Sequence, residues 1–389
     1  EHERPEARQA ATQALLVTGG GGLALLAAGL LLVDAGGTSL LSDLTAGGSL
    51  AGHPLYGGIV ALMLLAAFTK SAQFPFHFWL PNAMQAPTRV SAYLYSATMV
   101  KAGVYLVARM TPLLGGTTIW TSTITVVATL TMTIGALRAL VETDLKRVLA
   151  YSTISALGIL MLLFGVGTPQ AVTAGFAYLL AHACYKGAFF LIAGAVEHET
   201  GTRDVALLGG LRRAMPFTAL GAALAAGSMA GIPLFGGFIA KEQFYDSLAA
   251  SGLPGIWSGV LVSLAVAPSM CLGAAGLIAG IAPFRGGATP TPAHHDAPPS
   301  LWLGPLVLGA VGVIVGVIPA LAAAPIALAG ESVTGTRSTV VLALWHGFTA
   351  TLLMSALTLA GSVALFTSRV RLWRLRWGAG FLGRRLLKF

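Results

Sequence analysis

Charged residues are scarce in this sequence. Of its 389 residues only 10% are Asp, Glu, Lys or Arg, whereas a soluble globular domain carries about 25%. Hydrophobic residues make up 56%, and the mean hydropathy is +0.80. These values exclude a disordered chain and argue strongly against a soluble enzyme, since apolar runs of roughly 20 residues cross a bilayer as helices. The composition therefore predicts an all-α polytopic membrane protein.

The sequence also has few cysteines and lacks the common hydrolase motifs. The two cysteines, Cys184 and Cys271, lie inside apolar runs, so we interpret them as small buried residues rather than as disulfide or zinc ligands. The stretch His294-His295-Asp296 belongs to a Pro-rich and His-rich segment, and we interpret it as solvated polar linker. No Gly-x-Ser-x-Gly, His-Glu-x-x-His or Gly-rich phosphate loop occurs. We therefore expect no hydrolase, no metal site and no organic cofactor.

Ten apolar runs predict transmembrane helices. They cover residues 12–34, 56–80, 89–111, 116–138, 147–166, 171–195, 215–246, 255–281, 301–327 and 340–366. The second run contains Lys70 followed by Pro75, and the seventh contains Gly231 and Pro233 before Lys241. Proline removes a backbone donor and glycine loosens a helix, so both helices, 56–80 and 215–246, should be broken within the membrane.

Lysine and arginine are distributed unevenly between the two sides of the predicted membrane protein. If the N-terminal segment is cytoplasmic, the lysines and arginines outside the predicted spans all face the cytoplasm, except Arg109 and Arg337. The positive-inside rule then places both ends of this piece in the cytoplasm. The net charge of +9 is largely this excess and does not indicate a nucleic-acid partner. The tail 367–389 mixes Arg with Trp and Phe, which is typical of a basic amphipathic segment on the cytoplasmic bilayer surface; a plain stop-transfer flank is the alternative.

The two broken helices indicate an internal repeat. Residues 112–283 form a five-helix unit whose fourth helix is broken, and 1–111 fit the remainder of a first unit that lacks two spans. Because five is odd, successive units have opposite orientation, which is the inverted-repeat architecture of secondary transporters. Residues 284–300 then form a cytoplasmic linker and 301–366 two further helices. The chain begins with Glu1 rather than Met, and we expect a piece of a longer protein.

Ionisable side chains inside the predicted spans are costly there and mark function by default. Burial favours the neutral form of an amine and a nearby carboxylate favours the ammonium, so such a lysine can relay protons. Tyr178, His182 and Lys186 follow one another at four-residue spacing and share a helix face. The predicted proton and ion pathway comprises Lys70, His77, Lys101, Tyr178, His182, Lys186, Lys241 and Glu242.

The four lysines and His77 also have structural interpretations. A lysine can reach the interface with its long stem, and His77 can be a structural histidine beside the break. The predicted spans contain four lysines but at most one buried acid, Glu242. This charge balance is poor for an isolated membrane domain. We therefore expect counter-charges from other subunits or from another part of the chain.

Several long motifs resemble the antiporter-like subunits shared by respiratory complex I and Mrp-type cation/proton antiporters. They include Lys70-Ser-Ala-Gln-Phe-Pro-Phe-His-Phe-Trp-Leu-Pro81, Thr143-Asp-Leu-Lys-Arg147 and Met229-Ala-Gly-Ile-Pro-Leu234. Within that superfamily, His182-Ala-Cys-Tyr-Lys-Gly-Ala188 and Leu344-Trp-His-Gly-Phe348 resemble the large MrpA-type component of the multisubunit Mrp sodium/proton antiporter. Two positions depart from the usual pattern, which has proline in place of Arg89 and histidine in place of Tyr95.

The resemblance implies an ion-translocating subunit of a monovalent cation (Na+)/proton antiporter in the bacterial cell membrane, with other subunits and the lipid bilayer as partners. It gives Lys70 and Lys241 the places of the lysines at the two broken helices, and Lys101, His182 and Lys186 the central polar axis. The alternative is a proton-pumping subunit of complex I or a related membrane-bound hydrogenase. A scaffold without a working relay is a third possibility.

Overall fold

The protein is helical throughout the part that its computed structural model describes, namely residues 4–250, 255–286, 295–335, 340–345 and 347–383. In these ranges the sole strand-like pairing is an isolated antiparallel bridge between Asp144 and Asp204. The helices are α1 (Pro5–Gly36), α2 (Leu41–Ala46), α3 (Tyr56–Lys70), α4 (Trp79–Asn82), α5 (Thr88–Ser96), α6 (Ala102–Leu114), α7 (Thr118–Val141), α8 (Leu145–Val166), α9 (Pro169–Thr200), α10 (Pro216–Ala230), α11 (Gly236–Ala249), α12 (Gly255–Gly280), α13 (Pro299–Val317), α14 (Ala320–Thr334) and α15 (Ala350–Gly383). Seven of those described are long and apolar enough to cross a membrane, and α3, α10 and α14 are shorter apolar helices. The predicted all-α membrane fold is therefore confirmed.

The two predicted helix breaks are present. Helix α3 ends at Lys70, the chain passes through Ala72 at a φ of 48°, and a 3₁₀ turn, Phe76–Phe78, leads into α4. Helix α10 ends before Gly231 (φ 73°), and the chain bends through Leu234 (φ 75°) into α11. Both breaks lie at the Gly and Pro positions that indicated them.

A third break contradicts the continuous helix predicted over 89–111. The chain leaves the helical region at Thr98 (ψ −90°) and forms a 3₁₀ turn, Met99–Lys101, between α5 and α6. The Ser71 hydroxyl donates to the carbonyl of Val100 at 2.7 Å and accepts from the Val104 N–H at 3.1 Å. Ser71, in the α3–α4 break, thus satisfies backbone groups that the α5–α6 break leaves unpaired. This pairing makes the α5–α6 break tolerable inside a membrane.

The C-terminal third also differs from the prediction. The single helix expected over 301–327 is two helices, because α13 ends at Val317 and Pro319 begins a new direction in α14. The helix expected from residue 340 begins at Ala350, and the described residues before it are non-helical, with Gly347 at a φ of 86°. Helix α15 continues to Gly383, into the predicted tail 367–389; the rest of that tail and residues 287–294 of the predicted linker lie outside the described residues.

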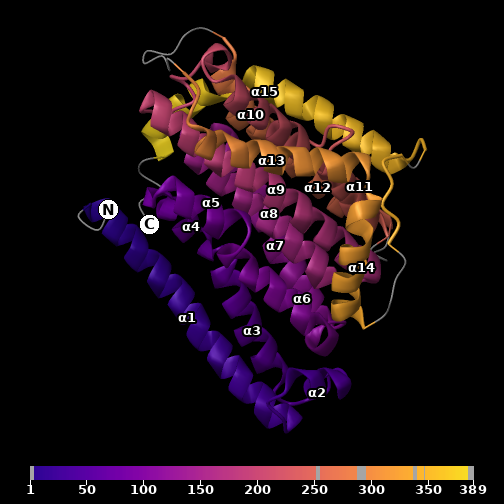
Figure 1. Ribbon diagram of the computed structural model, residues 1–389. Helices are drawn as coiled ribbons and strands as arrows, with labels where there is room; N and C mark the ends of the chain where they lie inside the picture. Colours follow the sequence, from indigo (N-terminus) through magenta and orange to yellow (C-terminus); the bar gives the residue numbers. More distant parts are fainter. Residues whose placement is uncertain (1–3, 251–254, 287–294, 336–339, 346, 384–389) are drawn as a thin grey trace.

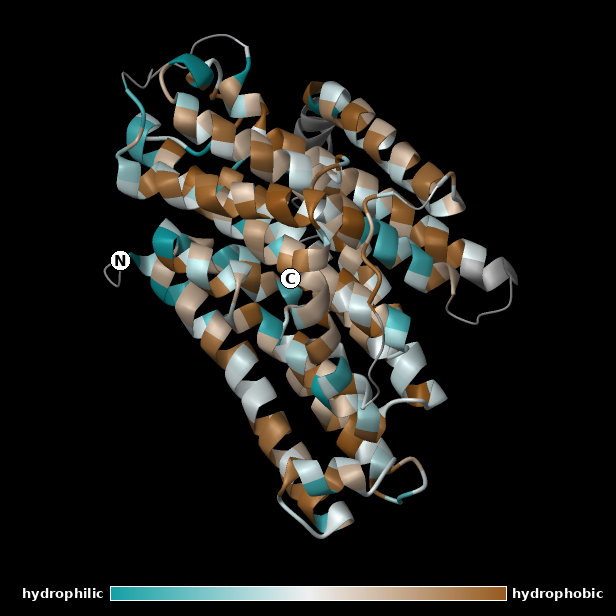
Figure 2. Ribbon diagram, turned by 45° about the vertical axis from the view of Figure 1, so that its right-hand side comes forward, coloured by the Kyte–Doolittle hydropathy of each residue, from teal (hydrophilic) through white to brown (hydrophobic). Residues whose placement is uncertain are grey.

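The helices form one bundle with α8 at its centre. Helix α8 is buried along its whole apolar stretch and packs against α7, α9 and α12, in the middle of the molecule in Figure 1. The contact with α7 is very close, because a Cβ added to Gly158 would lie 2.6 Å from the backbone nitrogen of Met132. Helix α1 runs along the edge beside α3, and hydrophobic residues cover most of the length of the peripheral helices (Figure 2).

Candidate functional site

Lys101 is placed at the unpredicted break between α5 and α6. Its side chain is 6% exposed, and its ammonium nitrogen has no hydrogen-bond partner among the described residues. It lies within electrostatic range of His182 and Lys186 on α9. Lys101, His182 and Lys186, which lie in two separate sequence motifs, are therefore near one another in the interior.

The α9 stripe is buried as predicted. Tyr178, His182 and Lys186 are 8%, 0% and 0% exposed. The His182 ring lies 6.5 Å from that of Tyr178 and 5.3 Å from that of Tyr185, and neither of its nitrogens has a hydrogen-bond partner in the part of the chain that the structure describes. The stripe thus holds a buried imidazole between two tyrosine rings, with both of its nitrogens unpartnered among the described residues.

Lys186 reaches across to the central helix. Its ammonium nitrogen donates to the carbonyl of Leu149 at 3.2 Å and to the hydroxyl of Ser152, both on α8. The Ser152 hydroxyl itself donates to the carbonyl of Val148 at 2.8 Å. The lysine is therefore held by neutral oxygens, which can solvate an ammonium without fixing its charge as a carboxylate would.

Lys241 lies at the second break. It is on α11, and its ammonium nitrogen donates to the carbonyl of Ala230, the last residue of α10, at 2.6 Å. Glycine suits the neighbouring position 231, because its φ is 73° and a Cβ there would lie 2.6 Å from the lysine nitrogen. Glu242 follows on the same helix and is 4% exposed. The broken helix thus offers a free carbonyl at the point where a buried amine needs an acceptor.

A small cavity lies between Tyr178 of the α9 stripe and Lys241. Its volume, counted as the space open to the centre of a water molecule, is about 20 Å³, and roughly 10–15 Å³ by that measure holds one water. Its lining includes Tyr178, Tyr185, Ser228, Lys241 and Ser269. The Ser228 hydroxyl is buried and unpartnered among the described residues, so it is available to such a water.

Lys70 and His77 are not part of this cluster. Lys70 is half-buried at the end of α3, and His77 is half-buried in the 3₁₀ turn that follows. The His77 ring stacks on Phe74 at 6.0 Å and lies within electrostatic range of Arg138 on α7. In the described residues neither side chain contacts Lys101, the α9 stripe or Lys241, so their predicted role in the pathway stays a prediction.

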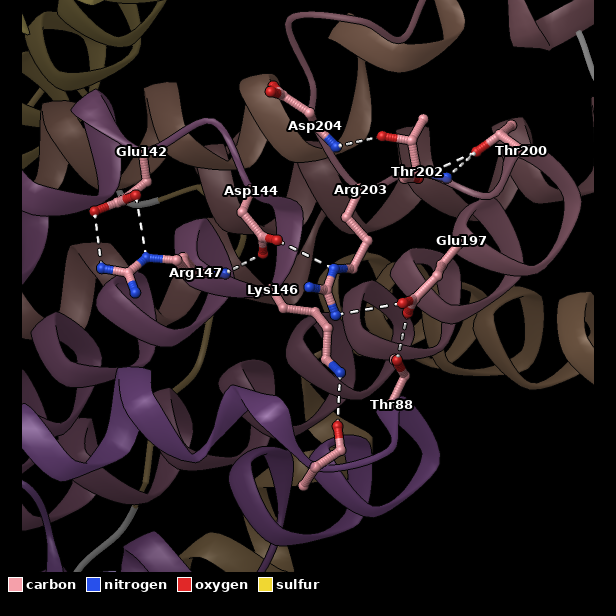
Figure 3. Close-up of polar contacts among 11 residues, drawn as sticks. Thr88, Glu142, Asp144, Lys146, Arg147, Glu197, Thr200, Thr202, Arg203 and Asp204 are labelled. Atoms are coloured by element: carbon pink, nitrogen blue, oxygen red, sulfur yellow. Dashed lines mark hydrogen bonds and ion pairs between the residues drawn. The ribbon is translucent and has the colours of Figure 1, made fainter. Parts of the chain in front are cut away.

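An ion-pair network at one end of the bundle was not predicted from the sequence (Figure 3). Arg203 pairs with Asp144 at 3.1 Å and with Glu197 at 3.3 Å, and Glu197 accepts from the Thr88 hydroxyl at 3.0 Å. Together these contacts tie the starts of α5 and α8 to the end of α9.

Two further contacts complete this end of the bundle. Arg147 pairs with Glu142 at 3.2 Å, and buried Lys146 donates to the carbonyl of Ala86 at 2.7 Å. The motif Thr143-Asp-Leu-Lys-Arg147 was the available signal, but spacing alone does not pair it with residues 197–203.

Comparisons with known proteins fit this geometry. The family model described as "NADH:quinone oxidoreductase/Mrp antiporter, TM" matches residues 1–266. A probable K(+)/H(+) antiporter component of A/B type from Rhizobium meliloti is 41% identical over 373 residues, which cover 94% of this chain and 37% of that protein. The A-type component of the Na(+)/H(+) antiporter from Alkalihalophilus pseudofirmus is 37% identical over 402 residues, covering 93% of this chain and 49% of that protein. The chain thus spans half or less of the length of these two relatives.

A solved structure agrees with these relatives. A chain in the structure of the Mrp complex from Dietzia sp. DQ12-45-1b superposes with a TM-score of 0.86 at 36% sequence identity. The match covers 99% of this chain and 41% of that one. The fold described above is therefore also found in a chain of that complex.

Proposed function

This chain belongs to the NADH:quinone oxidoreductase/Mrp antiporter transmembrane family, and from that membership we propose that it is an ion-translocating part of a multisubunit monovalent cation/proton antiporter. The observation that carries the proposal is the buried cluster of Lys101, His182 and Lys186, together with Lys241, which lies across a small cavity from Tyr178 and Tyr185 on the same helix as His182. The relatives named as cation/proton antiporter components favour exchange without redox chemistry over the redox-driven proton pump.

The proposed mechanism is coupled titration among these groups. Lys101 and Lys186 lie within electrostatic range of each other, and two like charges in a low-dielectric interior disfavour simultaneous ionisation. A proton that arrives at one of them therefore favours release from the other. His182, beside both, accepts or donates a proton in between, and one water in the cavity carries it to Lys241.

We also propose which cation is exchanged, where the counter-charges come from and how the protein is oriented in the membrane. One relative is named for K+ and the other for Na+; we propose Na+ as the exchanged cation. Counter-charges for Lys70 and the buried lysines come from other subunits or from sequence beyond this piece. The clustering of Arg147 and Arg203 at one end of the bundle supports placing that end in the cytoplasm, with the protein in the bacterial cell membrane.

Everted membrane vesicles that contain the full complex provide the test. We expect Lys186→Ala and Lys241→Ala each to slow sodium-driven proton movement, read with a pH-sensitive dye, by about 100-fold, the usual size of a lost proton-transfer group. Arg212→Ala, which removes an exposed cation at the end of the bundle, is the matched control and should exchange at the parental rate, with assembly verified for each variant. Exchange that survives both lysine changes would make the chain a scaffold, and no sodium-driven signal in the parent would favour the redox pump.

A further inference from the structure

The buried face of α15 is lined with hydroxyl groups. In its described part the buried positions are Thr351, Ser355, Thr358, Ser362 and Phe366, whose spacing of three or four residues places them on one side of the helix. Leucines between them, including Leu353 and Leu357, are exposed. The helix therefore presents apolar residues outward and hydroxyls to α11 and α12, against which it packs.

Close packing alone does not account for this face. Small side chains do let membrane helices approach, and a Cβ added to Gly273 of α12 would lie 2.2 Å from the Ser362 hydroxyl. Alanine would serve that purpose equally well. However, the hydroxyl of Tyr245 on α11 hydrogen-bonds the Thr358 hydroxyl at 2.7 Å, and the buried Ser355 hydroxyl has no partner in the ranges that the structure describes.

These hydroxyls connect the Lys241 cavity with a surface of the molecule. Ser269 lines that cavity and lies within electrostatic range of the Tyr245 hydroxyl, while its own hydroxyl donates to the carbonyl of Ala265 at 2.8 Å. At the other end, the Thr351 hydroxyl pairs with that of Thr349 at 2.8 Å, and Thr349 is exposed in the segment before α15.

We propose that Ser269, Tyr245, Thr358, Ser355 and Thr351 form a proton path from the Lys241 cavity to the membrane surface at which α15 begins. This is the outer surface in the orientation proposed above. The inference rests on the proposed function, because it assumes that Lys241 gives up a proton. It adds the route by which that proton leaves.

The chemistry of hydroxyls suits such a path. Each hydroxyl both donates and accepts, so it takes up one proton while releasing its own to the next oxygen and then rotates back. The Lys241 ammonium becomes a neutral amine, one proton leaves at Thr349, and no intermediate group keeps a charge. Ser355 is one helical turn from Thr358 on one side and from Thr351 on the other, about 5–6 Å in each case. The proposed path therefore needs one water on each side of the unpartnered Ser355 hydroxyl.

The first test removes hydroxyls without changing shape. In the assembled complex we expect Thr358→Val and Tyr245→Phe to slow sodium-driven proton movement by about ten-fold or more, whereas Thr358→Ser keeps the parental rate. Thr367→Val is the matched control, because Thr367 is exposed on the same helix and bonds only its own helix at the carbonyl of Ala364. Ser355→Ala replaces Thr358→Val if the latter does not assemble. Parental rates in both Tyr245→Phe and the α15 variant would overturn the path.

The second test reads hydration independently of exchange. Thr351→Cys and Ser355→Cys should react with a membrane-impermeant methanethiosulfonate added from outside to whole cells, and Leu353→Cys, on the exposed apolar face, should not. Unreactive cysteines at 351 and 355 would refute the path. Loss of exchange in Lys241→Ala but not in Thr358→Val would refute only the path, whereas intact exchange in Lys241→Ala would refute the proposed function itself.

Discussion

At the scale of single residues, Gly231 is the position on which the geometry of Lys241 depends most directly. Gly231→Ala would place a methyl group 2.6 Å from the lysine nitrogen and 2.8 Å from its Cε, so the amine must leave the Ala230 carbonyl. The left-handed backbone adds about 1–2 kcal/mol of strain. We expect exchange in everted vesicles to fall by about ten-fold, equivalent to roughly 1.4 kcal/mol in the barrier, with the complex still assembled.

Gly335→Ala separates the two effects of that substitution. Gly335 has a φ of 68°, close to that of Gly231, but a Cβ there meets no atom within 4 Å. It therefore carries the backbone strain without displacing a lysine, and we expect the parental exchange rate. Equal losses in the two variants would show that strain rather than the position of Lys241 matters.

The buried polar residues that the sequence identifies most clearly are those whose side chains are energetically costly inside a membrane. Lys101, His182 and Lys186 stood out because a charge or imidazole in an apolar run requires a reason, and the structure brings them together. Their acceptors could not be predicted, because the Leu149 carbonyl and the Ser152 hydroxyl carry no such signal. Lys70 and His77 show the opposite case: their sequence context marks them, but their surroundings in this chain leave their role open.

At the scale of elements, the start of α8 depends on Asp144. Its carboxylate caps the helix by accepting from the Arg147 N–H at 3.0 Å, and it also pairs with Arg203 at 3.1 Å. Asp144→Ala removes both contacts, whereas Asp144→Asn keeps a capping side chain. We expect the alanine variant to lose about 1–2 kcal/mol, read as a lower melting temperature of the detergent-purified complex. The asparagine variant should lose less, since a part-exposed ion pair contributes about 0–1 kcal/mol; equal losses would show that the cap contributes nothing.

Helix breaks were predictable from the sequence only where a glycine or proline marks them. The breaks after Lys70 and Ala230 coincide with Pro75, Gly231 and Pro233, whereas the break before Lys101 has no glycine or proline on its N-terminal side within α5. It is stabilised from outside by Ser71, a contact between segments about thirty residues apart that no local pattern contains. The Pro319 break was signalled but hidden within a long apolar run.

At the scale of the whole molecule, the proposed pathway combines irregular points of different helices. The α5–α6 break supplies Lys101, the α10–α11 break supplies the acceptor of Lys241, and the regular helices α8 and α9 hold the groups between them. Sequence periodicity describes the regular helices well, which is why the fold class was predictable. It says nothing about which breaks lie close together in space, so the proposed order of groups along the pathway depends on the structure.

The orientation of this molecule rests on charge distribution and can be tested across one helix. Helix α13 has 19 residues, about 28 Å at 1.5 Å each, which matches the roughly 30 Å hydrocarbon core. Arg285 lies before it, and Gly335 follows α14 beyond it. Fluorescent-protein and alkaline-phosphatase fusions after Gly286 and after Gly335 should therefore give opposite results. We expect fluorescence at the first site and phosphatase activity at the second, because the arginine-rich side stays in the cytoplasm. The reverse pattern would invert the orientation and with it the direction of the proton path along α15, and identical signals at both sites would show that α13 and α14 together return the chain to the same side.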